Sequence, residues 1–168
     1  MAGSTEIPQT VALADVPHFT DEFDVVVAGL GMAGGCAAVE AASNGARVLV
    51  LERAAVAGGT TSLAGGHFYL GGGTAVQEAT GHADSAEEME KYLTAVSADP
   101  DPEKIHAYCQ GSVEHFTWLE ALGFSFERSY YPEKAVIQPQ TQGLMYTGNE
   151  KVWPFRDIAV PADRKSVV

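Results

Sequence analysis

The stretch Asp24-Val25-Val26-Val27-Ala28-Gly29-Leu30-Gly31-Met32-Ala33-Gly34 joins an apolar run to three glycines in the spacing G-x-G-x-x-G. Its β-branched beginning is typical of a strand buried on both faces of a parallel sheet. Residues 31–44 are rich in alanine and predict a helix, and Gly45 follows where a left-handed residue would end it. Residues 47–52 predict a second buried strand. The sequence therefore predicts a β-α-β unit of about thirty residues.

Each glycine of the motif has a role in binding a dinucleotide. Gly29 makes the tight turn, Gly31 admits the pyrophosphate, and Gly34 lets helix and strand pack together. The N-terminus of the helix then faces the anion. Glu52 closes the second strand, where a carboxylate can accept hydrogen bonds from both ribose hydroxyls and would repel a 2′-phosphate. This unit fits both NAD and FAD, which share the adenosine diphosphate half.

Glycine doublets follow Glu52, at Gly58-Gly59 and Gly65-Gly66, and a triplet follows at 71–73. We predict no regular helix in this tract. Glycines allow the backbone to approach a ligand closely, and a surface loop remains the alternative interpretation.

This tract resembles the corresponding segment of one flavoprotein family, which contains fumarate reductase and succinate dehydrogenase flavoprotein subunits, 3-ketosteroid Δ1-dehydrogenases and urocanate-reductase-like enzymes. The resemblance rests on Glu52-Arg53, Gly58-Gly59-Thr60-Thr61-Ser62 and Ala64-Gly65-Gly66. The Gly-Gly-Thr-Thr form is most similar to the ketosteroid dehydrogenase branch. The resemblance implies FAD as the cofactor, because the segment after the ribose carboxylate runs along the pyrophosphate and ribityl chain in that family.

The resemblance also implies contacts for individual residues. Gly59, Thr60 and Thr61 would contact the phosphates or the ribityl chain, and Gly65 and Gly66 would lie against the flavin ring. The predicted cofactor-binding residues are Gly29, Gly31, Met32, Ala33, Gly34, Glu52, Arg53, Gly59, Thr60, Thr61, Gly65 and Gly66.

Two residues are candidates for catalysis. His67 directly follows Gly66, where an imidazole could donate to a flavin oxygen or to a carbonyl, and a structural loop histidine is the alternative. The stretch 129–133 resembles the tyrosine-bearing segment of ketosteroid dehydrogenases, which makes Tyr131 the candidate phenol. Tyr146 competes for that role, and packing is the alternative for all these aromatic side chains.

The rest of the chain predicts helices followed by short strands. A capping box at Ser85-Ala86-Glu87-Glu88 predicts a helix to about Ser97. A second helix is predicted from Pro102 to just before Gly123, with one buried apolar stripe of Ile105, Tyr108, Cys109, Phe116, Leu119 and Leu122. Residues 124–160 predict small strands and loops.

The predicted fold class is α/β, with an incomplete Rossmann-like FAD/NAD(P)-binding β-α-β core followed by the start of an α+β substrate (cap) domain. We expect a flexible leader at residues 1–20, the FAD-binding unit and glycine-rich loop at 21–84, and the helical segment and start of the substrate domain at 85–168. An exposed apolar edge is expected, because only two main strands are evident. The residues beyond Pro161, 162–168, depart from the family pattern, which we interpret as a truncated or frame-shifted reading frame.

Composition excludes several classes of partner. A net charge of −12 and a pI near 4.6 argue against nucleic acid and anionic membrane surfaces. Cys36 and Cys109 match no metal-ligand spacing or redox motif and predict reduced, buried thiols. With neither a secretory signal nor a membrane span evident, we expect a cytoplasmic protein.

The expected function is the FAD-binding portion of an oxidoreductase that dehydrogenates or reduces a carbon-carbon bond next to a carbonyl or carboxylate. A ketosteroid-like or fumarate-like small molecule would be the substrate of the complete enzyme, and this chain alone is expected to be incomplete for catalysis. The alternative is a non-catalytic dinucleotide-binding module, or one subunit of a split flavoprotein completed by another chain.

Overall fold

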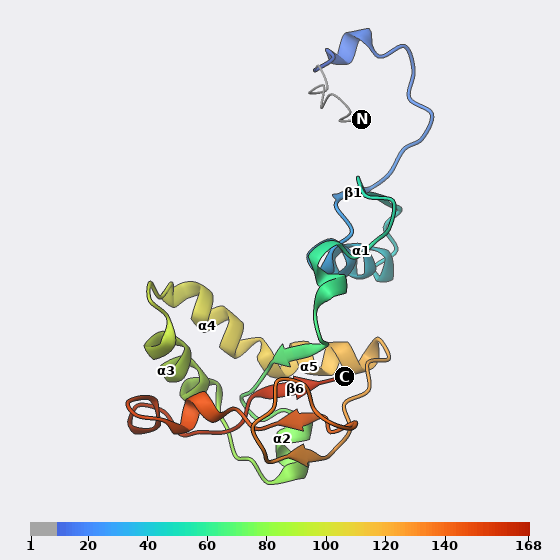
Figure 1. The fold of residues 1–168 in the computed structure, drawn as a ribbon. Helices are drawn as coiled ribbons and strands as arrows, with labels where there is room; N and C mark the ends of the chain where they lie inside the picture. The colour runs from blue at the N-terminus through green and yellow to red at the C-terminus, as the bar shows by residue number, and fades with distance from the viewer. Residues whose placement is uncertain (1–9) are drawn as a thin grey trace, which may run out of the picture. The chain divides into compact units, whose positions relative to one another are not determined.

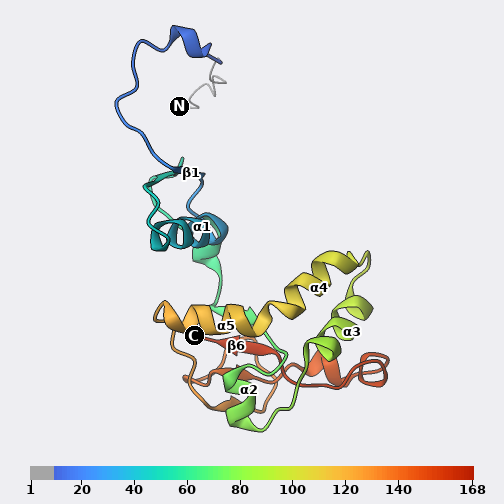
Figure 2. The same ribbon diagram turned by 180° about the vertical axis from the view of Figure 1, so that it is seen from behind.

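The computed structural model of the chain describes residues 10–168, which form two compact units (Figures 1 and 2). One unit ends at Ala64 and the other runs from Gly65 to Val168. The predicted leader lies partly on residues 1–9, outside the described residues, and its remainder holds a 3-10 helix, η1 (Leu13–Asp15). The predicted boundary between the FAD-binding part (21–84) and the start of the substrate domain (85–168) is a boundary between functions, and it stays a prediction.

The first unit is a β-α-β arrangement. Strand β1 (Val25–Ala28) pairs in parallel with β2 (Val48–Leu51), and helix α1 (Met32–Ser43) connects them. Parallel strands need a crossover connection, and α1 provides it. The order β1, α1, β2 confirms the predicted β-α-β unit. A 3-10 helix, η2 (Gly59–Leu63), follows β2 within the tract where no regular helix was predicted.

The strands of this unit are less buried than the sequence pattern predicts. Side chains alternate between half-buried and exposed along β1, with Val26 58% exposed, and Leu51 at the end of β2 is 53% exposed. The prediction of strands buried on both faces is therefore wrong for these residues. The physical reason is that two strands and one helix provide no second layer, and the predicted exposed apolar surface is confirmed.

The second unit is built on a four-stranded sheet in the order β3-β6-β5-β4. Its strands are β3 (His67–Tyr69), β4 (Tyr130–Tyr131), β5 (Leu144–Met145) and β6 (Lys165–Val167). Strand β6 pairs antiparallel with both β3 and β5, while β4 and β5 are parallel. The segment that departs from the family pattern thus supplies an inner strand of this sheet.

The second unit also contains four α-helices. They are α2 (Ala75–Thr80), α3 (Ala86–Val96), α4 (Pro102–Gln110) and α5 (Ser112–Ala121), and the short 3-10 helices η3 (Gly148–Lys151) and η4 (Phe155–Asp157) precede β6. Of these helices, α3 and α4 pack against each other. Residues of β5, α2, α5 and the adjoining loops form the main apolar core, which consists of Leu70, Val76, Phe116, Leu119, Phe126 and Leu144. This burial holds α5 against the sheet.

The helix predicted from Pro102 to Gly123 is two helices, which corrects the prediction. Gly111 separates α4 from α5 with a ψ of −4°, and Ser112 is buried and accepts a hydrogen bond from the Gly71 N–H at 2.9 Å. The predicted stripe divides with the helices, since Cys109, Phe116 and Leu119 are buried whereas Tyr108 and Leu122 are more than 40% exposed. A helical pattern tolerates an isolated glycine, so periodicity did not reveal the break.

The predicted helix at Ser85 is confirmed, and half of its capping box forms. The Ser85 hydroxyl accepts a hydrogen bond from the Glu88 N–H at 3.2 Å. The Glu88 carboxylate does not return to Ser85 but accepts from the Val160 N–H at 2.7 Å and pairs with Lys91. A tertiary contact has taken the place of the local one.

Candidate functional site

The glycine turn of the first unit has the geometry that its sequence predicts. Gly29 adopts a φ of +96°, which side-chain-bearing residues rarely adopt. A Cβ on Gly34 would lie 1.9 Å from the Gly29 carbonyl oxygen and 3.2 Å from Cγ1 of Val27. Gly29 therefore makes the turn, and Gly34 allows α1 to pack against β1.

Gly31 differs from these two glycines. Its φ of −85° suits any residue, and an added Cβ would meet Oγ1 of Thr61 at 3.7 Å and the Gly58 carbonyl oxygen at 3.9 Å, both ordinary contacts. The protein's own packing does not require glycine here. A glycine that the fold itself does not require is expected at the position that approaches a pyrophosphate.

Glu52 lies next to the same turn. Its Oε1 accepts a hydrogen bond from the Ala54 N–H at 2.8 Å, and its Oε2 accepts one from the Leu30 N–H at 2.7 Å. Both hydrogen bonds lower the pKa of the carboxyl below its usual value, and the bond from Ala54 has the larger effect. Glu52 is therefore an ionised acceptor, and its remaining lone pairs can accept from ribose hydroxyls. Arg53 beside it is exposed.

The segment after Gly58 lies directly against the turn. The Gly58 N–H donates to the Leu30 carbonyl at 2.7 Å, and Oγ1 of Thr61 accepts from the Met32 N–H at 3.0 Å. Gly58 and Gly59 adopt φ values of +107° and +51°. Gly58 contacts the turn but was not among the predicted site residues. The doublet Gly58-Gly59 was the sequence signal that could have identified it. Thr60 and Ala33, which were predicted to bind the cofactor, are exposed beside these groups.

The two candidate catalytic residues lie in the second unit, on opposite outer strands. His67 is on β3 and Tyr131 is on β4, with β6 and β5 between them. Three strand spacings of about 4.8 Å separate these strands by about 14 Å. The structure therefore does not bring His67 and Tyr131 to one site.

His67 has an available ring nitrogen. Its Nε2 is buried without a hydrogen-bond partner among the described residues. Burial and, second, the positive charge of Lys165 lower the pKa of the imidazole, so that it is neutral near pH 7. Its ring lies close to Gly65, where an added Cβ would be 3.2 Å from Nδ1. Gly66, with a φ of +72°, accepts the Val168 N–H at 3.3 Å.

The neighbouring tyrosines have different surroundings. The Tyr131 hydroxyl donates to Oε2 of Glu133 at 3.3 Å, and desolvation and this carboxylate raise the pKa of the phenol. The Tyr130 hydroxyl donates to Oδ2 of Asp163 at 2.7 Å, and burial followed by the Asp163 contact raises its pKa as well. Sequence reasoning missed the Tyr130–Asp163 pair, because 33 residues separate its members and no local motif links them.

Asp163 is a fully buried carboxylate with a positive φ of +49°. Its Oδ1 accepts the Thr147 N–H at 2.7 Å, and its Oδ2 accepts from Tyr130 and, at 2.9 Å, from the Lys151 ammonium. Nε2 of His82 lies 3.5 Å from Oδ2. Burial alone would raise the pKa of Asp163, but these contacts outweigh it and lower the pKa.

This lowered pKa predicts sensitivity to acid. A carboxyl whose pKa is lower in the folded than in the unfolded state stabilises the fold when the pH is above the unfolded pKa, here 3.8. This contribution is lost as the pH falls through the folded pKa. We expect the urea midpoint of the Gly65–Val168 unit to fall below about pH 4, and Asp163→Asn to reduce that dependence. The exposed Asp157 provides the control Asp157→Asn, which should keep the wild-type profile. Equal profiles for all three proteins would contradict this role of Asp163.

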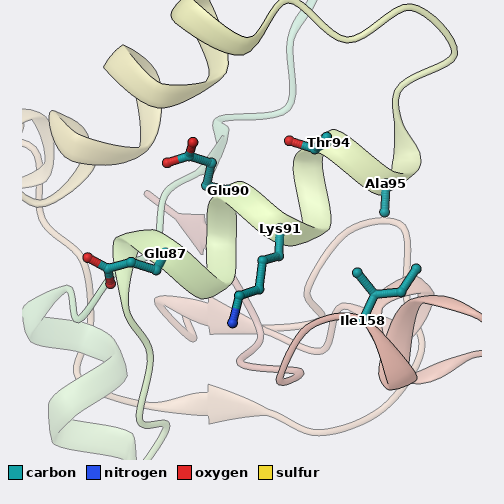
Figure 3. A pocket seen from close by; sticks show the side chains of 6 residues that line it. All are labelled: Glu87, Glu90, Lys91, Thr94, Ala95 and Ile158. Atoms are coloured by element: carbon teal, nitrogen blue, oxygen red, sulfur yellow. The ribbon is translucent and has the colours of Figure 1, made fainter.

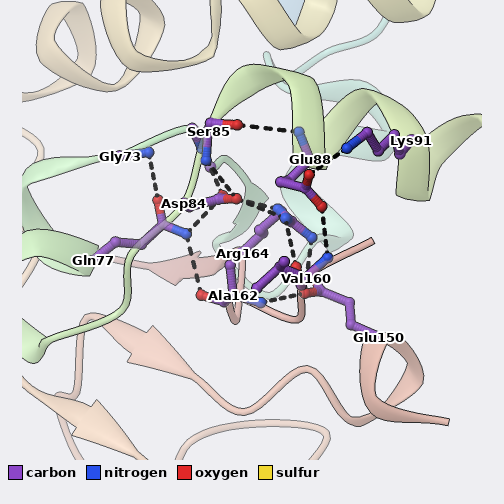
Figure 4. A network of polar contacts seen from close by, with 12 residues as sticks. Gly73, Gln77, Asp84, Ser85, Glu88, Lys91, Glu150, Val160, Ala162 and Arg164 are labelled. Atoms are coloured by element: carbon purple, nitrogen blue, oxygen red, sulfur yellow. Dashed lines mark hydrogen bonds and ion pairs between the residues drawn. The ribbon is translucent and has the colours of Figure 1, made fainter. Parts of the chain in front are cut away.

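A second polar network centres on Arg164 (Figure 4). Its guanidinium is fully buried and donates to Asp84 through Nε at 2.9 Å and Nη2 at 2.6 Å, and to Oε2 of Glu150 through Nη1 at 2.9 Å. Tyr69 donates to Oε1 of Glu150 at 2.7 Å. Gln77 Nε2 also donates to Asp84, at 3.1 Å. These contacts connect three segments: Arg164 directly precedes β6, Asp84 precedes the N-cap of α3, and Glu150 lies in η3. Every charged group in the network is paired.

A cavity of about 560 Å³ lies along α3 (Figure 3). Figure 3 shows the α3 side chains on one side and Ile158 on the other, and the lining consists of Glu87, Glu90, Lys91, Thr94, Ala95 and Ile158. It contains none of the residues that the sequence predicted for a site.

Within residues 10–168, no helix is long and apolar enough to cross a membrane.

Comparisons with known proteins agree with the turn geometry. The sequence family described as FAD binding domain matches residues 24–157. The crystal structure of 3-ketosteroid-Δ4-(5α)-dehydrogenase from Rhodococcus jostii RHA1, in complex with 4-androstene-3,17-dione, is 48% identical with a TM-score of 0.85, covering 92% of this chain and 32% of that one.

Two curated relatives show the same relationship over shorter stretches. The 3-oxo-5-alpha-steroid 4-dehydrogenase of Comamonas testosteroni is 36% identical over 143 residues, which is 84% of this chain and 27% of the relative. A fumarate reductase (cytochrome) of Shewanella frigidimarina is 36% identical over 113 residues, which is 67% of this chain and 19% of the relative. The chain thus spans about a quarter or less of the length of these two relatives.

Proposed function

Because this chain belongs to the FAD binding domain family and has FAD as its cofactor, we propose that it is the cofactor-binding portion of a flavin oxidoreductase. The substrate class of the whole protein would be a ketosteroid-like or fumarate-like small molecule, which its relatives' names support. The reaction would be dehydrogenation or reduction of a carbon-carbon bond next to a carbonyl or carboxylate.

The observation that carries this proposal is an ionised Glu52 whose carboxylate is held at the glycine turn that precedes the N-terminus of α1. The turn from Gly29 to Gly34 would hold the pyrophosphate through backbone N–H groups, and Glu52 would hold the ribose hydroxyls. Thr61 would lie next to the phosphates, because its hydroxyl already contacts the Met32 N–H. When bound, FAD would supply the acceptor or donor of a hydride.

We propose different catalytic roles for the two candidate residues. His67 is neutral and its Nε2 has no hydrogen-bond partner within residues 10–168, so it could donate a hydrogen bond to a substrate or cofactor oxygen. Gly65 and Gly66 precede it and would lie against the flavin ring. Tyr131 would act as the phenol in proton transfer only after its hydroxyl leaves Glu133.

The binding proposal is tested by Glu52→Gln. Purified wild-type chain should bind FAD with the visible absorption of bound flavin, and the variant should bind it about tenfold more weakly, because a neutral amide is a weaker acceptor than a carboxylate. The affinity is measured by titration of the apoprotein with FAD. The control is Glu22→Gln, an exposed residue ahead of β1.

The same titration with NAD separates the two dinucleotides. We expect FAD to bind more tightly than NAD. Equal affinity of Glu52→Gln and wild type for FAD, or preferential binding of NAD, would contradict the proposal.

A second candidate function is one subunit of a split flavoprotein, with the missing parts on another chain. The exposure of Val26 and Leu51 supports it, because further strands or helices would cover these side chains. Co-purification of a second chain with flavin turnover would favour this candidate over a non-catalytic module. The cytoplasmic location and the absence of nucleic-acid partners remain proposals from composition.

A further inference from the structure

The basic side chains of the second unit are almost all ion-paired. Eight lysines and arginines lie between residues 65 and 168, and six of them have a carboxylate oxygen within 4.0 Å: Lys91, Lys104, Arg128, Lys151, Arg156 and Arg164. Lys134 and Lys165 have no carboxylate partner among the described residues. Two unpaired cations are unexpected in a chain with 22 acidic residues.

Both unpaired lysines line one cavity of about 380 Å³. The rest of its lining comes from the loop around Tyr146 and from nearby residues, namely Ala135, Tyr146, Thr147, Gly148, Asn149 and Val152. This volume is in the range of small-molecule sites. The cavity lies wholly within the second unit and shares no residue with the glycine turn.

Lys165 is half-buried on β6 and has capacity for another partner. Its ammonium donates to the Val136 carbonyl oxygen at 3.0 Å, which leaves two of its three N–H groups unassigned. Desolvation lowers its pKa, and its positive charge also contributes to the lowered pKa of His67. A partly desolvated cation without a counter-charge is costly, and a bound anion would offset that cost.

The lining of the cavity indicates which kind of anion fits. Ala135, Val152 and Tyr146 line the cavity together with the two lysines, and the Lys151 ammonium lies over the Tyr146 ring, 4.4 Å from its centroid. An inorganic anion would leave the apolar part of this lining unused, whereas an organic acid has a hydrocarbon body to place on it. Each lysine ammonium is a compact point charge that can pair with a carboxylate oxygen.

We propose that this cavity binds a small organic carboxylate, which pairs with Lys134 and Lys165 and packs its hydrocarbon part on Tyr146 and Val152. The site is independent of the FAD site and would exist in the chain without flavin. It goes beyond the proposed function, since no predicted cofactor residue and neither His67 nor Tyr131 lines it; Tyr146, the alternative candidate phenol, is part of the lining.

The test is an NMR titration of the full chain with benzoate, which follows the amide signals of Thr147, Gly148 and Asn149. Benzoate should shift these signals in a saturable manner, and uncharged benzamide should not. Lys134→Gln should weaken benzoate binding about tenfold, because one charge-assisted contact is lost. Lys134 is exposed, so this variant is expected to fold.

The matched control is Lys104→Gln, which removes an equal charge from α4 and leaves the cavity intact. It should bind benzoate like wild type, whereas Lys165→Gln should weaken binding as Lys134→Gln does. The proposal is overturned if benzoate shifts none of the three signals, or if Lys134→Gln and Lys104→Gln behave alike. Inorganic phosphate that competes as well as benzoate would overturn the assignment to organic carboxylates. Because the readout does not involve flavin, a failure here is separate from a failure of FAD binding.

Discussion

Replacing Arg164 with leucine is expected to lower the free energy of unfolding of the Gly65–Val168 unit by about 3–5 kcal/mol. The guanidinium, Asp84 and Glu150 are all 0–1% exposed. Removal of the cation leaves two buried carboxylates without their counter-charge, and the network has no water-exposed side to relax into. Urea unfolding followed by tryptophan fluorescence measures this effect, because Trp118 and Trp153 both lie in this unit.

The control for this prediction is Arg156→Leu. Arg156 pairs with Asp157 at 3.7 Å, with both side chains more than half exposed. Exposed pairs contribute about 0–1 kcal/mol, so the control should change the urea midpoint little. A loss below about 1 kcal/mol for Arg164→Leu would show that the buried network is not a main source of stability.

Gly34→Ala is expected to weaken FAD binding strongly. The new Cβ would be placed 1.9 Å from the Gly29 carbonyl oxygen, so α1 must move away from the turn that faces the cofactor. Overpacking of this kind costs about 1–3 kcal/mol, and we expect the upper end, which corresponds to about a 100-fold weaker affinity. Titration of the apoprotein with FAD measures it.

Gly35→Ala is the matched control, because it makes the same substitution one residue later in α1. A Cβ at this position would meet no atom within 4 Å. Alanine also favours a helix over glycine by about 1 kcal/mol, so this variant should bind FAD like wild type and be at least as stable. Similar losses in both variants would show that helix composition, not the contact at Gly29, is responsible.

The sequence was informative about the first unit because its signals are local. The run from Val25 to Gly34 encodes a strand, a turn with positive φ and a helix start within a few residues, and the backbone of Gly29 and the packing at Gly34 confirm it. The ribose carboxylate at Glu52 follows at a fixed spacing, so a single pattern sufficed to predict that the ligand is a dinucleotide.

The sequence was less informative about the second unit, where contacts join distant residues. Ser112, directly after the break at Gly111, accepts a hydrogen bond from the distant Gly71 N–H, and the Glu88 carboxylate at the Ser85 cap accepts from Val160. Local propensity cannot anticipate partners that arrive from another part of the chain.

The order of the amino acids was therefore sufficient for the β-α-β unit and its dinucleotide turn, since both depend on short-range backbone geometry, whereas FAD rather than NAD followed from the resemblance of the glycine-rich tract to a flavoprotein family. The inner position of β6, the pairing of Arg164 with Asp84 and the separation of His67 from Tyr131 followed only from the folded chain. These features depend on the order of the strands in the sheet. That order brings together segments that are far apart in sequence, and it is set by the burial of apolar faces and the pairing of buried charges over the whole unit.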